Sequence, residues 1–478
     1  MIKLPNSHSA SHRLWLVLGL LFSLLHVFVT DTGADTIDRF VRSEMERQQI
    51  PGVALAVVKH GKIVKAKGYG LANIEHSVPV IQETVFQSAS VGKQFTAAGV
   101  LLLAEEGKLG LDDPISRYLT NAPPTWQGIT VRHLLNHTSG IPEYNTQKEF
   151  NLRQDYSEEE LVTLAAGLKL DFAPESEWKY SDTGYVLLGV IVHRVTGTFY
   201  GDFLQERIFK PLGMTSTRVI NEPNIILHRA AGYELIGGEV KNQAWLSPSL
   251  NTMAHGSLYF TVLDVASWDA ALYTDNPLSA RIREQMWTAA RFGNGATTSL
   301  KMGGGSYGCG WGLDTVAGHH VVQHGGSGQG FKTYIARFLD DGLTVILLCN
   351  LAQADHTAFA HGVARRSLPA LKGRSIVDPD PAFSVHVADV LRSAAAGSLK
   401  PEWFTDEVRK EQVTAWNKDF SRRLKNTGSV VRLELLEVKV QDGVTRLIYL
   451  AKCERETLRL TMCLNAAREI STLKLATE

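Results

Sequence analysis

The chain has 478 residues, 44% of them hydrophobic, which is enough for a substantial core and for two or three domains. Lysine and arginine total 49, as do aspartate and glutamate, so the formal net charge at pH 7 is zero. Since no basic cluster interrupts this balance, the sequence gives no electrostatic reason to bind nucleic acid. The expected partners are small-molecule or short-peptide substrates.

Residues 1–34 have the pattern of an export signal. Lys3 and Arg13 precede an apolar run at 14–29, and small and polar residues follow it. The run is short for a secure membrane span, but no A-x-A cleavage site comes after it. Cleavage and retention as a membrane anchor therefore both stay open, and we expect a periplasmic or secreted protein.

The next part of the chain begins with a helix and two strands and continues as mostly helical sequence. The polar stretch 35–49 is expected to be helical, and strands at 52–58 and 63–70 form a hairpin around His60-Gly61. Ser157 and Glu160 have the spacing of a helix capping box. The helices expected in this part are 95–106, 130–136, 157–168, 184–195 and 203–209.

Strand patterns return after residue 308. Segments 310–314, 321–323, 332–338 and 343–348 alternate or run apolar, and a closing helix is expected at 358–368. Strands at both ends of a helical middle predict one sheet built from N- and C-terminal segments. The predicted fold class is therefore α+β, with a domain spanning 35–371.

A composition change separates a smaller C-terminal part. Residues 372–381 contain Gly373 and two Asp-Pro pairs, as is typical of a linker. Beyond it, helices are expected within 383–396 and 405–424. Four strands at 429–440, 444–453, 456–464 and 470–475 should follow. Residues 382–478 are thus predicted to form a small α+β accessory domain.

The four cysteines are too few and too scattered for a disulfide framework. Cys349 lies in an apolar run and is expected to be buried in a strand. Pairing of Cys453 with Cys463 stays open at this point.

Three short segments carry residues suited to nucleophilic catalysis. Ser90 and Lys93 are three residues apart at the start of a helix, so both lie on one face, with the hydroxyl near the positive helix end. A desolvated lysine can accept a proton near neutral pH. Tyr180 is a second candidate base. The glycines after His324 let a backbone approach a ligand closely.

The order of these segments resembles the serine β-lactamase and penicillin-binding-protein superfamily. The closest likeness is to the class C-like, β-lactamase-related hydrolases, which include D-aminopeptidases, carboxypeptidase-type DD-peptidases and esterases. The likeness covers about residues 35–370 and implies an antiparallel sheet with flanking helices and a helical subdomain. It is carried by Ser90-x-x-Lys93, the Tyr180-led triplet, His324-x-Gly326, and segments 129–142, 208–214 and 260–264.

The resemblance implies a role for each matching residue. Ser90 would attack an acyl carbon, Lys93 would accept or relay its proton, and Tyr180 would act as general base and carry the proton to the leaving group. The backbone N–H groups of Ser90 and Ser327 would form the oxyanion hole. His324, Gly325 and Gly326 would occupy the substrate-binding strand, where a K-T-G motif often stands.

Two positions depart from the family pattern. Asp182 stands where the tyrosine triplet commonly ends in asparagine, and a carboxylate there would hold Lys93 protonated. It replaces an amide donor with an acceptor, so it implies either an altered substrate, such as one with a free amino group, or impaired turnover. His324 replaces a lysine and is expected to be a weaker, pH-dependent partner for a substrate carboxylate.

His133 and His137 are spaced like metal ligands, but no H-E-x-x-H glutamate or third ligand accompanies them. We expect them to brace the Ser139-Gly140 turn instead. The predicted chemistry needs no metal or organic cofactor.

The sequence therefore predicts an exported serine hydrolase that forms an acyl-enzyme on Ser90. Its substrate is left open among a D-amino-acid peptide, a β-lactam and a small ester, with a cell-wall origin as one option. The alternative is a sensor that binds penicillin or peptidoglycan peptides without turnover. For the C-terminal domain, the order of helices followed by strands weakly resembles cystatin- or NTF2-like modules.

Overall fold

The computed structural model describes residues 35–148, 150–221, 223–244, 247, 253–298, 305–425, 427–441 and 443–478. The expected export segment at 1–34 lies outside these residues. Within the described ranges, no helix combines the length and apolar character needed to cross a bilayer.

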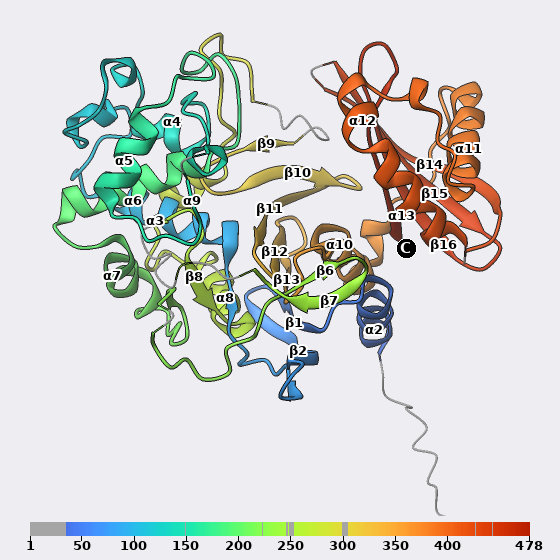
Figure 1. The fold of residues 1–478 in the computed structure, drawn as a ribbon, viewed down its shortest axis with the longest axis horizontal. Coiled ribbons are helices and arrows are strands. Elements are labelled where there is room, and N and C mark those ends of the chain that lie inside the picture. Colours follow the sequence, from blue (N-terminus) through green and yellow to red (C-terminus); the bar gives the residue numbers. More distant parts are fainter. Residues whose placement is uncertain are drawn as a thin grey trace, which may run out of the picture.

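An eight-stranded antiparallel sheet organises the larger part of the molecule (Figure 1). Its strand order is β3-β2-β1-β13-β12-β11-β10-β9, and β1 pairs with both β2 and β13, placing Leu55 opposite Leu347. The predicted joining of N- and C-terminal segments in one sheet is therefore confirmed. The strands are β1 (Gly52–Lys59), β2 (Lys62–Asn73), β3 (Val78–Pro79), β9 (Ser306–Tyr307), β10 (Gly312–Val316), β11 (His319–Gly328), β12 (Phe331–Phe338) and β13 (Leu343–Cys349).

Two helices, α2 (Thr36–Gln48) and α10 (His356–Ser367), pack together over one face of this sheet. Phe40 and Phe359 meet edge to face with ring centroids 5.8 Å apart. These helices share a core with alternate residues of β1, β12 and β13, while the intervening residues belong to a second core on the opposite face of the sheet. Burial on both faces explains why β1 and β13 are apolar on successive positions rather than alternating.

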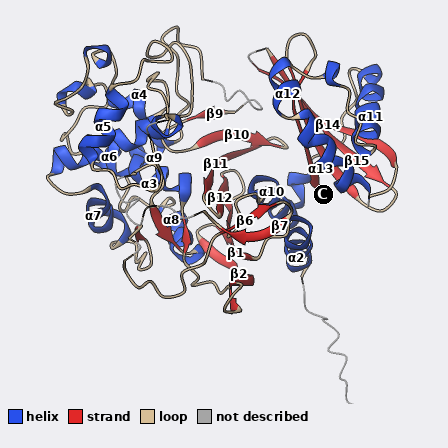
Figure 2. Cartoon of the chain, viewed as in Figure 1, coloured by secondary structure: helices blue, strands red, loops and turns tan. Residues whose placement is uncertain are grey.

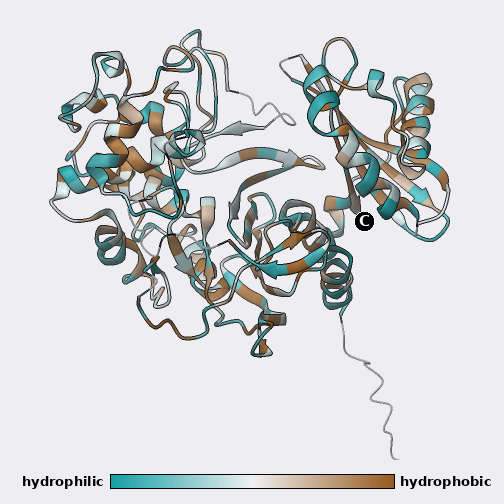
Figure 3. Ribbon diagram, in the orientation of Figure 1, coloured by the Kyte–Doolittle hydropathy of each residue, from teal (hydrophilic) through white to brown (hydrophobic). Residues whose placement is uncertain are grey.

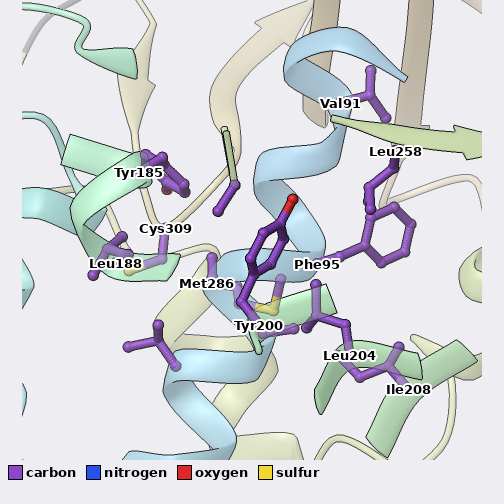
Figure 4. Close-up of a cluster of buried hydrophobic side chains, with 14 of the residues drawn as sticks. Val91, Phe95, Tyr185, Leu188, Tyr200, Leu204, Ile208, Leu258, Met286 and Cys309 are labelled. Atoms are coloured by element: carbon purple, nitrogen blue, oxygen red, sulfur yellow. The ribbon is translucent and has the colours of Figure 1, made fainter. Parts of the chain in front are cut away.

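The opposite side of the sheet carries the helical subdomain, grouped around α3 (Figures 1 and 2). Every residue of α3 from Lys93 to Leu103 is buried, because other helices pack around it. Figure 4 shows Phe95 of α3 among Tyr185, Leu204 and Met286, which come from three different helices. The helices are α3 (Lys93–Glu105), α4 (Val131–Leu135), α5 (Glu158–Ala166), α6 (Asp182–Thr196), α7 (Tyr200–Leu204), α8 (Val262–Ala271) and α9 (Ala280–Met286).

Local sequence signals set several of these helix ends. Ser157 and Glu160 form the predicted capping box of α5, and α6 ends at Gly197, which adopts a left-handed backbone with φ +69°. The helix expected at 203–209 differs, because α7 passes into a π-helical turn at Gln205–Phe209.

Two small sheets complete this part of the chain. One has the order β4-β8-β5 and the other pairs β6 with β7. Their strands are β4 (Phe86–Gln87), β5 (Arg218–Val219), β6 (Tyr233–Ile236), β7 (Glu239–Asn242) and β8 (Leu258–Phe260). Since β4 ends three residues before Ser90, the pairing of β4 with β8 fixes the direction from which the chain enters that turn.

The C-terminal part has its own core under a four-stranded antiparallel sheet ordered β14-β15-β16-β17. Figure 3 shows hydrophobic and hydrophilic residues mixed along its helices, as expected of helices with one buried and one exposed face. The elements are α11 (Pro381–Ala395), α12 (Asp406–Glu411), α13 (Val413–Lys425), β14 (Val430–Gln441), β15 (Val444–Cys453), β16 (Thr457–Leu464) and β17 (Ile470–Thr477). The predicted α+β class is confirmed for both parts. All four cysteines are free, and Cys349 is buried on β13.

Candidate active site

Ser90 lies in a tight turn between β4 and α3. The turn is a 3-10 helix at Ala89–Gly92, and Ala89 has a left-handed backbone with φ +43°. Such a conformation is strained for a residue with a side chain and must be held by its surroundings. Gly256 packs directly on it, since a Cβ at 256 would lie 2.7 Å from the Ala89 carbonyl carbon. The turn thus depends on a residue without a side chain at position 256.

Ser88 ties the same turn to two strands. Its N–H donates to the Leu258 carbonyl at 2.8 Å, and its own carbonyl accepts from the Thr333 hydroxyl of β12 at 2.7 Å. The Ser88 hydroxyl donates to the Gly256 carbonyl at 2.9 Å. These bonds hold Ser90 at a fixed position beside the central sheet.

The Lys93 ammonium is completely buried and has three acceptors. Its Nζ lies 3.3 Å from Ser90 Oγ, 2.5 Å from Asp182 Oδ1 and 3.1 Å from the His255 carbonyl. Burial lowers the pKa of this amine, and the Asp182 carboxylate opposes that change. Lys93 therefore contacts both the nucleophile and a carboxylate. The sequence predicted this carboxylate contact, which would hold Lys93 protonated and oppose its use as a base.

Tyr180 places its ring against the same ammonium. Lys93 Nζ lies 4.7 Å from the ring centroid, and the Tyr180 hydroxyl is buried without an ordinary hydrogen-bond partner among the described residues. Burial raises the pKa of Tyr180 well above its usual value, and the nearby Ser90 hydroxyl lowers it only in part. The resting tyrosine is thus a neutral phenol, which favours a relay of protons over a standing phenolate base.

Asp182 begins α6 and is enclosed by charged and polar neighbours. Burial alone would raise its pKa, but His255, whose Nδ1 lies 3.5 Å from Oδ1, and Lys93 hold the pKa well below the usual range. Glu143 accepts the Asp182 N–H at 2.8 Å, and burial together with Asp182 raises the pKa of Glu143. The carboxylate of Asp182 is therefore ionised next to Lys93.

His324 is turned toward Tyr307 of β9. Its Nε2 lies 2.8 Å from the Tyr307 hydroxyl, and its Nδ1 lies 2.8 Å from the Gly325 carbonyl. Burial lowers the pKa of His324 to about 3, so the imidazole is neutral across the ordinary pH range. This differs from the sequence expectation of a pH-dependent partner for a carboxylate, because the ring is enclosed rather than open to solvent.

Gly325, Gly326 and Ser327 continue β11 past the end of its pairing with β10. A Cβ at Gly326 would lie 2.5 Å from the Ser88 carbonyl oxygen, so the strand passes very close to the nucleophile turn. Ser327, the exposed residue that follows, lies opposite Lys332 in the β11–β12 ladder. The structure therefore brings all eight residues predicted for the site to the junction of α3, α6 and β11.

The histidine pair of the helical subdomain has structural contacts. His133 Nε2 lies 2.9 Å from Glu175 Oε1, and His137 Nδ1 accepts the Ser181 N–H at 3.1 Å. Within the described ranges no cluster of three or more histidine, cysteine or acidic side chains could hold a metal ion. The centroid of the His137 ring lies 4.4 Å from that of the Tyr180 ring, so His137 packs against the tyrosine and helps to hold it in place.

Sequence reasoning missed four residues of the site. His255 supplies its carbonyl to Lys93 and its ring to Asp182, and its Nε2 lies 3.2 Å from the Tyr144 hydroxyl. Glu143 caps α6, and Tyr307 holds His324. Glu143 and Tyr144 directly follow segment 129–142, which carried part of the family resemblance. Their position next to that segment is the one sequence signal that pointed toward them.

Comparison with known proteins agrees with this arrangement. Residues 37–368 match the family model described as Beta-lactamase. Penicillin-binding protein 4* of Bacillus subtilis is 32% identical over 363 residues, covering 70% of this chain and 78% of that protein.

Two solved structures are similar in fold. D-amino acid amidase of Ochrobactrum anthropi SV3, complexed with D-phenylalanine, has a TM-score of 0.61 and 25% identity, covering 70% of this chain and 99% of that one. The octameric penicillin-binding protein homologue of Pyrococcus abyssi has a TM-score of 0.63 and 23% identity, covering 93% of this chain and 98% of that one. The second similarity extends over the C-terminal part as well.

Proposed function

Because the chain belongs to the β-lactamase family, a family of serine hydrolases, we propose that it hydrolyses amide or ester bonds through an acyl-enzyme on Ser90. One observation carries this proposal. The buried Lys93 Nζ lies 3.3 Å from Ser90 Oγ and also contacts Asp182, so the neutral amine form of Lys93 would have the Ser90 proton within reach.

The first half of the reaction would form the acyl-enzyme. Ser90 Oγ attacks the acyl carbon, and its proton passes to the neutral amine of Lys93, the form that burial favours, either directly or through the Tyr180 hydroxyl. The backbone N–H groups of Ser90 and Ser327 would stabilise the oxyanion, a donor contribution of about 3 kcal/mol each. As the tetrahedral intermediate collapses, Tyr180 returns the proton to the leaving amine or alcohol. Water then attacks the acyl carbon of the acyl-enzyme. Its proton passes through the same two side chains, in the reverse direction, to Ser90 Oγ.

Among the predicted substrates, D-amino-acid amides and short D-peptides have the most support. The D-amino acid amidase of Ochrobactrum anthropi is similar in fold at 25% identity. In addition, the acidic pair of Asp182 and Glu143 stands where a free amino group would be favoured electrostatically. A β-lactam or a small ester would lack this contact.

A second candidate is a sensor that binds penicillin or peptidoglycan peptides without turnover. The observation in its favour is the 2.5 Å contact between Lys93 and Asp182, which favours the protonated lysine, combined with a neutral Tyr180. A protein in that state would acylate slowly and release the acyl group more slowly still.

Labelling at Ser90 separates the two candidates. The full chain is treated with a fluorophosphonate or a fluorescent penicillin and followed by intact mass, with Ser90→Ala as control. The fluorophosphonate adduct is permanent and reports only that Ser90 is nucleophilic. A hydrolase shows a penicilloyl adduct that clears with time, whereas a sensor keeps it. Absence of any adduct under all conditions excludes the acyl-enzyme mechanism. Turnover of a D-amino-acid amide, a D-Ala-D-Ala peptide, a chromogenic cephalosporin and a short ester then ranks the substrates.

Export is part of the same proposal. Residues 1–34 would direct the chain to the periplasm or the medium. N-terminal sequencing of the protein recovered from cell fractions distinguishes a cleaved signal from a retained anchor.

A further inference from the structure

We propose that a cavity between the two parts of the chain binds a small dianion, which bridges α10 and the C-terminal sheet. A phosphate monoester and a dicarboxylate both have this chemistry. Such a ligand is independent of the chemistry at Ser90, and its binding goes beyond the proposed hydrolase function.

The cavity lies between one face of the C-terminal sheet and one side of α10. Residues along a strand alternate between faces, so Leu447 of β15 lies in the core of the C-terminal part while Arg446 lines the cavity. On α10, the lining residues Thr357, His361 and Arg365 recur every four positions and therefore share one side of the helix. The cavity volume of about 290 Å³ is close to the lower end of the roughly 300–1,000 Å³ usual for small-molecule sites.

Positive charge is in excess around this cavity. Two carboxylates and four basic side chains line it: Asp314, Glu437, Arg365, Arg446, Arg459 and Lys474. Arg446 contacts both of these carboxylates, and Lys439 lies 3.3 Å from Asp314, so these four charges offset one another. The Glu478 carboxylate is shared by Arg365 and Arg459, at 3.1 and 2.9 Å. Lys474 has no acid within ion-pair distance among the residues that the structure describes. An anion in the cavity would compensate the remaining positive charge.

Arg365 has hydrogen-bonding capacity that its neighbours leave unused. The residue is only 3% exposed, and its Nε forms no hydrogen bond with a described residue, although Glu478 Oε2 lies 3.1 Å away. Its Nη2 donates to the Thr477 carbonyl at a long 3.4 Å. A buried guanidinium that lacks acceptors is costly, and phosphate or carboxylate oxygens are the acceptors that fit its planar donors best. A bound dianion would supply them.

His361 shows where the positive charges act together. Its Nε2 lies 3.0 Å from Gln323 Oε1, and its ring lines the cavity. Burial lowers the pKa of His361 to about 3, and four basic side chains from α10, β15, β16 and β17 lower it as well: Arg365, Arg446, Arg459 and Lys474. Their charges therefore meet inside the cavity, where an anion would contact both parts of the chain.

Calorimetric titration of the full chain measures this binding. The probes are inorganic phosphate and succinate slightly above neutral pH, each compared with sodium chloride of equal ionic strength. Limited proteolysis in the same solutions reports cleavage at residues 373–380, which connect the two parts and contain no helix or strand.

Lys474→Ala and Lys474→Glu are the test variants, because Lys474 is exposed and its replacement leaves the core intact. Lys410→Ala is the matched control. Lys410 is exposed on α12, whose Val408 belongs to the core on the opposite face of the sheet.

We expect wild type to bind at least one of the two dianions with a Kd below about 1 mM. Lys474→Ala should weaken binding roughly tenfold, Lys474→Glu should weaken it further because its carboxylate repels the anion, and Lys410→Ala should bind as wild type. At ten times Kd, the dianion should slow cleavage of wild type at 373–380 by roughly tenfold, since it binds only when both parts are in place. Preference for phosphate would indicate a phosphorylated ligand, and preference for succinate a dicarboxylate.

Three results would overturn the inference. Absence of binding up to about 20 mM of either dianion would mean that the cavity holds water alone. Equal affinity in wild type and Lys474→Glu would place the bound anion elsewhere on the chain. Binding without slower cleavage would show that the ligand does not bridge the two parts.

Discussion

At the scale of single residues, the site is governed by one buried ammonium with three acceptors. Lys93 contacts a hydroxyl, a carboxylate and a carbonyl oxygen, so each of its N–H groups has a partner. Burial favours the neutral amine and Asp182 favours the charged form. The balance between these two influences sets how readily Ser90 loses its proton.

Tyr180→Phe tests the proton relay. The Tyr180 hydroxyl is buried and makes no ordinary hydrogen bond with a described residue, so its loss should change the melting temperature by less than about 2 °C. Loss of a group that moves a proton should lower the acylation rate by roughly 100-fold or more. Both quantities are measured on the same preparations, by thermal unfolding and by stopped-flow acylation.

Tyr200→Phe is the matched control, since the Tyr200 hydroxyl on α7 is likewise buried without an ordinary hydrogen bond to a described residue. It should leave acylation within about twofold of wild type. Equal rates in the Tyr180 and Tyr200 variants would remove Tyr180 from the mechanism.

Asp182→Asn tests the charge on Lys93. The Asp182 carboxylate raises the pKa of Lys93, whereas burial lowers it. Without the carboxylate the lysine pKa falls further, so the deprotonated base is present at lower pH. The ascending limb of the pH profile of kcat/KM should therefore move by about one unit or more toward acid.

Asp171→Asn provides the comparison, because Asp171 pairs with Lys179 near the surface at 2.5 Å. It should leave the profile in place. If the limb of Asp182→Asn also stays in place while the rate falls, Lys93 acts as a permanent cation and Tyr180 alone moves the proton.

At the scale of elements, β11 pairs with β12 in the sheet and also contacts the turn that carries Ser90. Gly326→Ala would place a Cβ 2.2 Å from Thr333 Oγ1 and 2.5 Å from the Ser88 carbonyl oxygen. That crowding displaces the bond between Thr333 and Ser88 and should cost about 2 kcal/mol in the free energy of unfolding. We expect acylation to fall by at least tenfold, as measured beside urea unfolding.

Gly328→Ala is the control within the same strand, since its Cβ would meet Ala89 Cβ at an ordinary 3.4 Å. Its stability should lie within about 0.5 kcal/mol of wild type. Similar losses in both variants would mean that glycine in β11 serves strand flexibility rather than close approach to Ser88.

Local patterns predicted the elements well, because the signals involved act over a few residues. The Ser157 cap, the stop at Gly197 and the hairpin at His60-Gly61 depend on nearest neighbours. Tyr307 and His255 could not be found in this way. Tyr307 reaches His324 only because β9 and β11 flank β10, and His255 reaches Lys93 across 162 residues of chain.

The electrostatic state of the site was predictable only in part. The conflict between Asp182 and Lys93 follows from residue types, and the structure shows the contact. The enclosure of His324 does not follow from residue types, because it depends on how Tyr307 and the surrounding rings pack. Burial, which decides these pKa shifts, is a property of the whole fold.

At the scale of the whole molecule, the C-terminal sheet is attached to the larger part through the edge of β10. Arg446 of β15 donates to Asp314 of β10 at 3.0 Å and to Glu437 of β14 at 2.8 Å. Burial lowers the pKa of this guanidinium, but the two carboxylates raise it above its usual value. A cavity of about 290 Å³ adjoins the pair and is lined by both parts of the chain.

Asp314→Ala tests whether this contact holds the two parts together. Arg446 is buried, and loss of one of its carboxylates should weaken the attachment by about 2 kcal/mol. Residues 373–380, which contain no helix or strand, connect the two parts and should become more accessible. Limited proteolysis is expected to cut there roughly tenfold faster, while acylation of Ser90 stays within about threefold of wild type.

Asp389→Ala is the control, since it removes an exposed pair with Arg392 on α11 and should leave cleavage unchanged. If Asp314→Ala is cut no faster than Asp389→Ala, the polar contacts of Arg365 and Arg366 on α10 with Thr477 and Glu478 hold the parts together without Arg446.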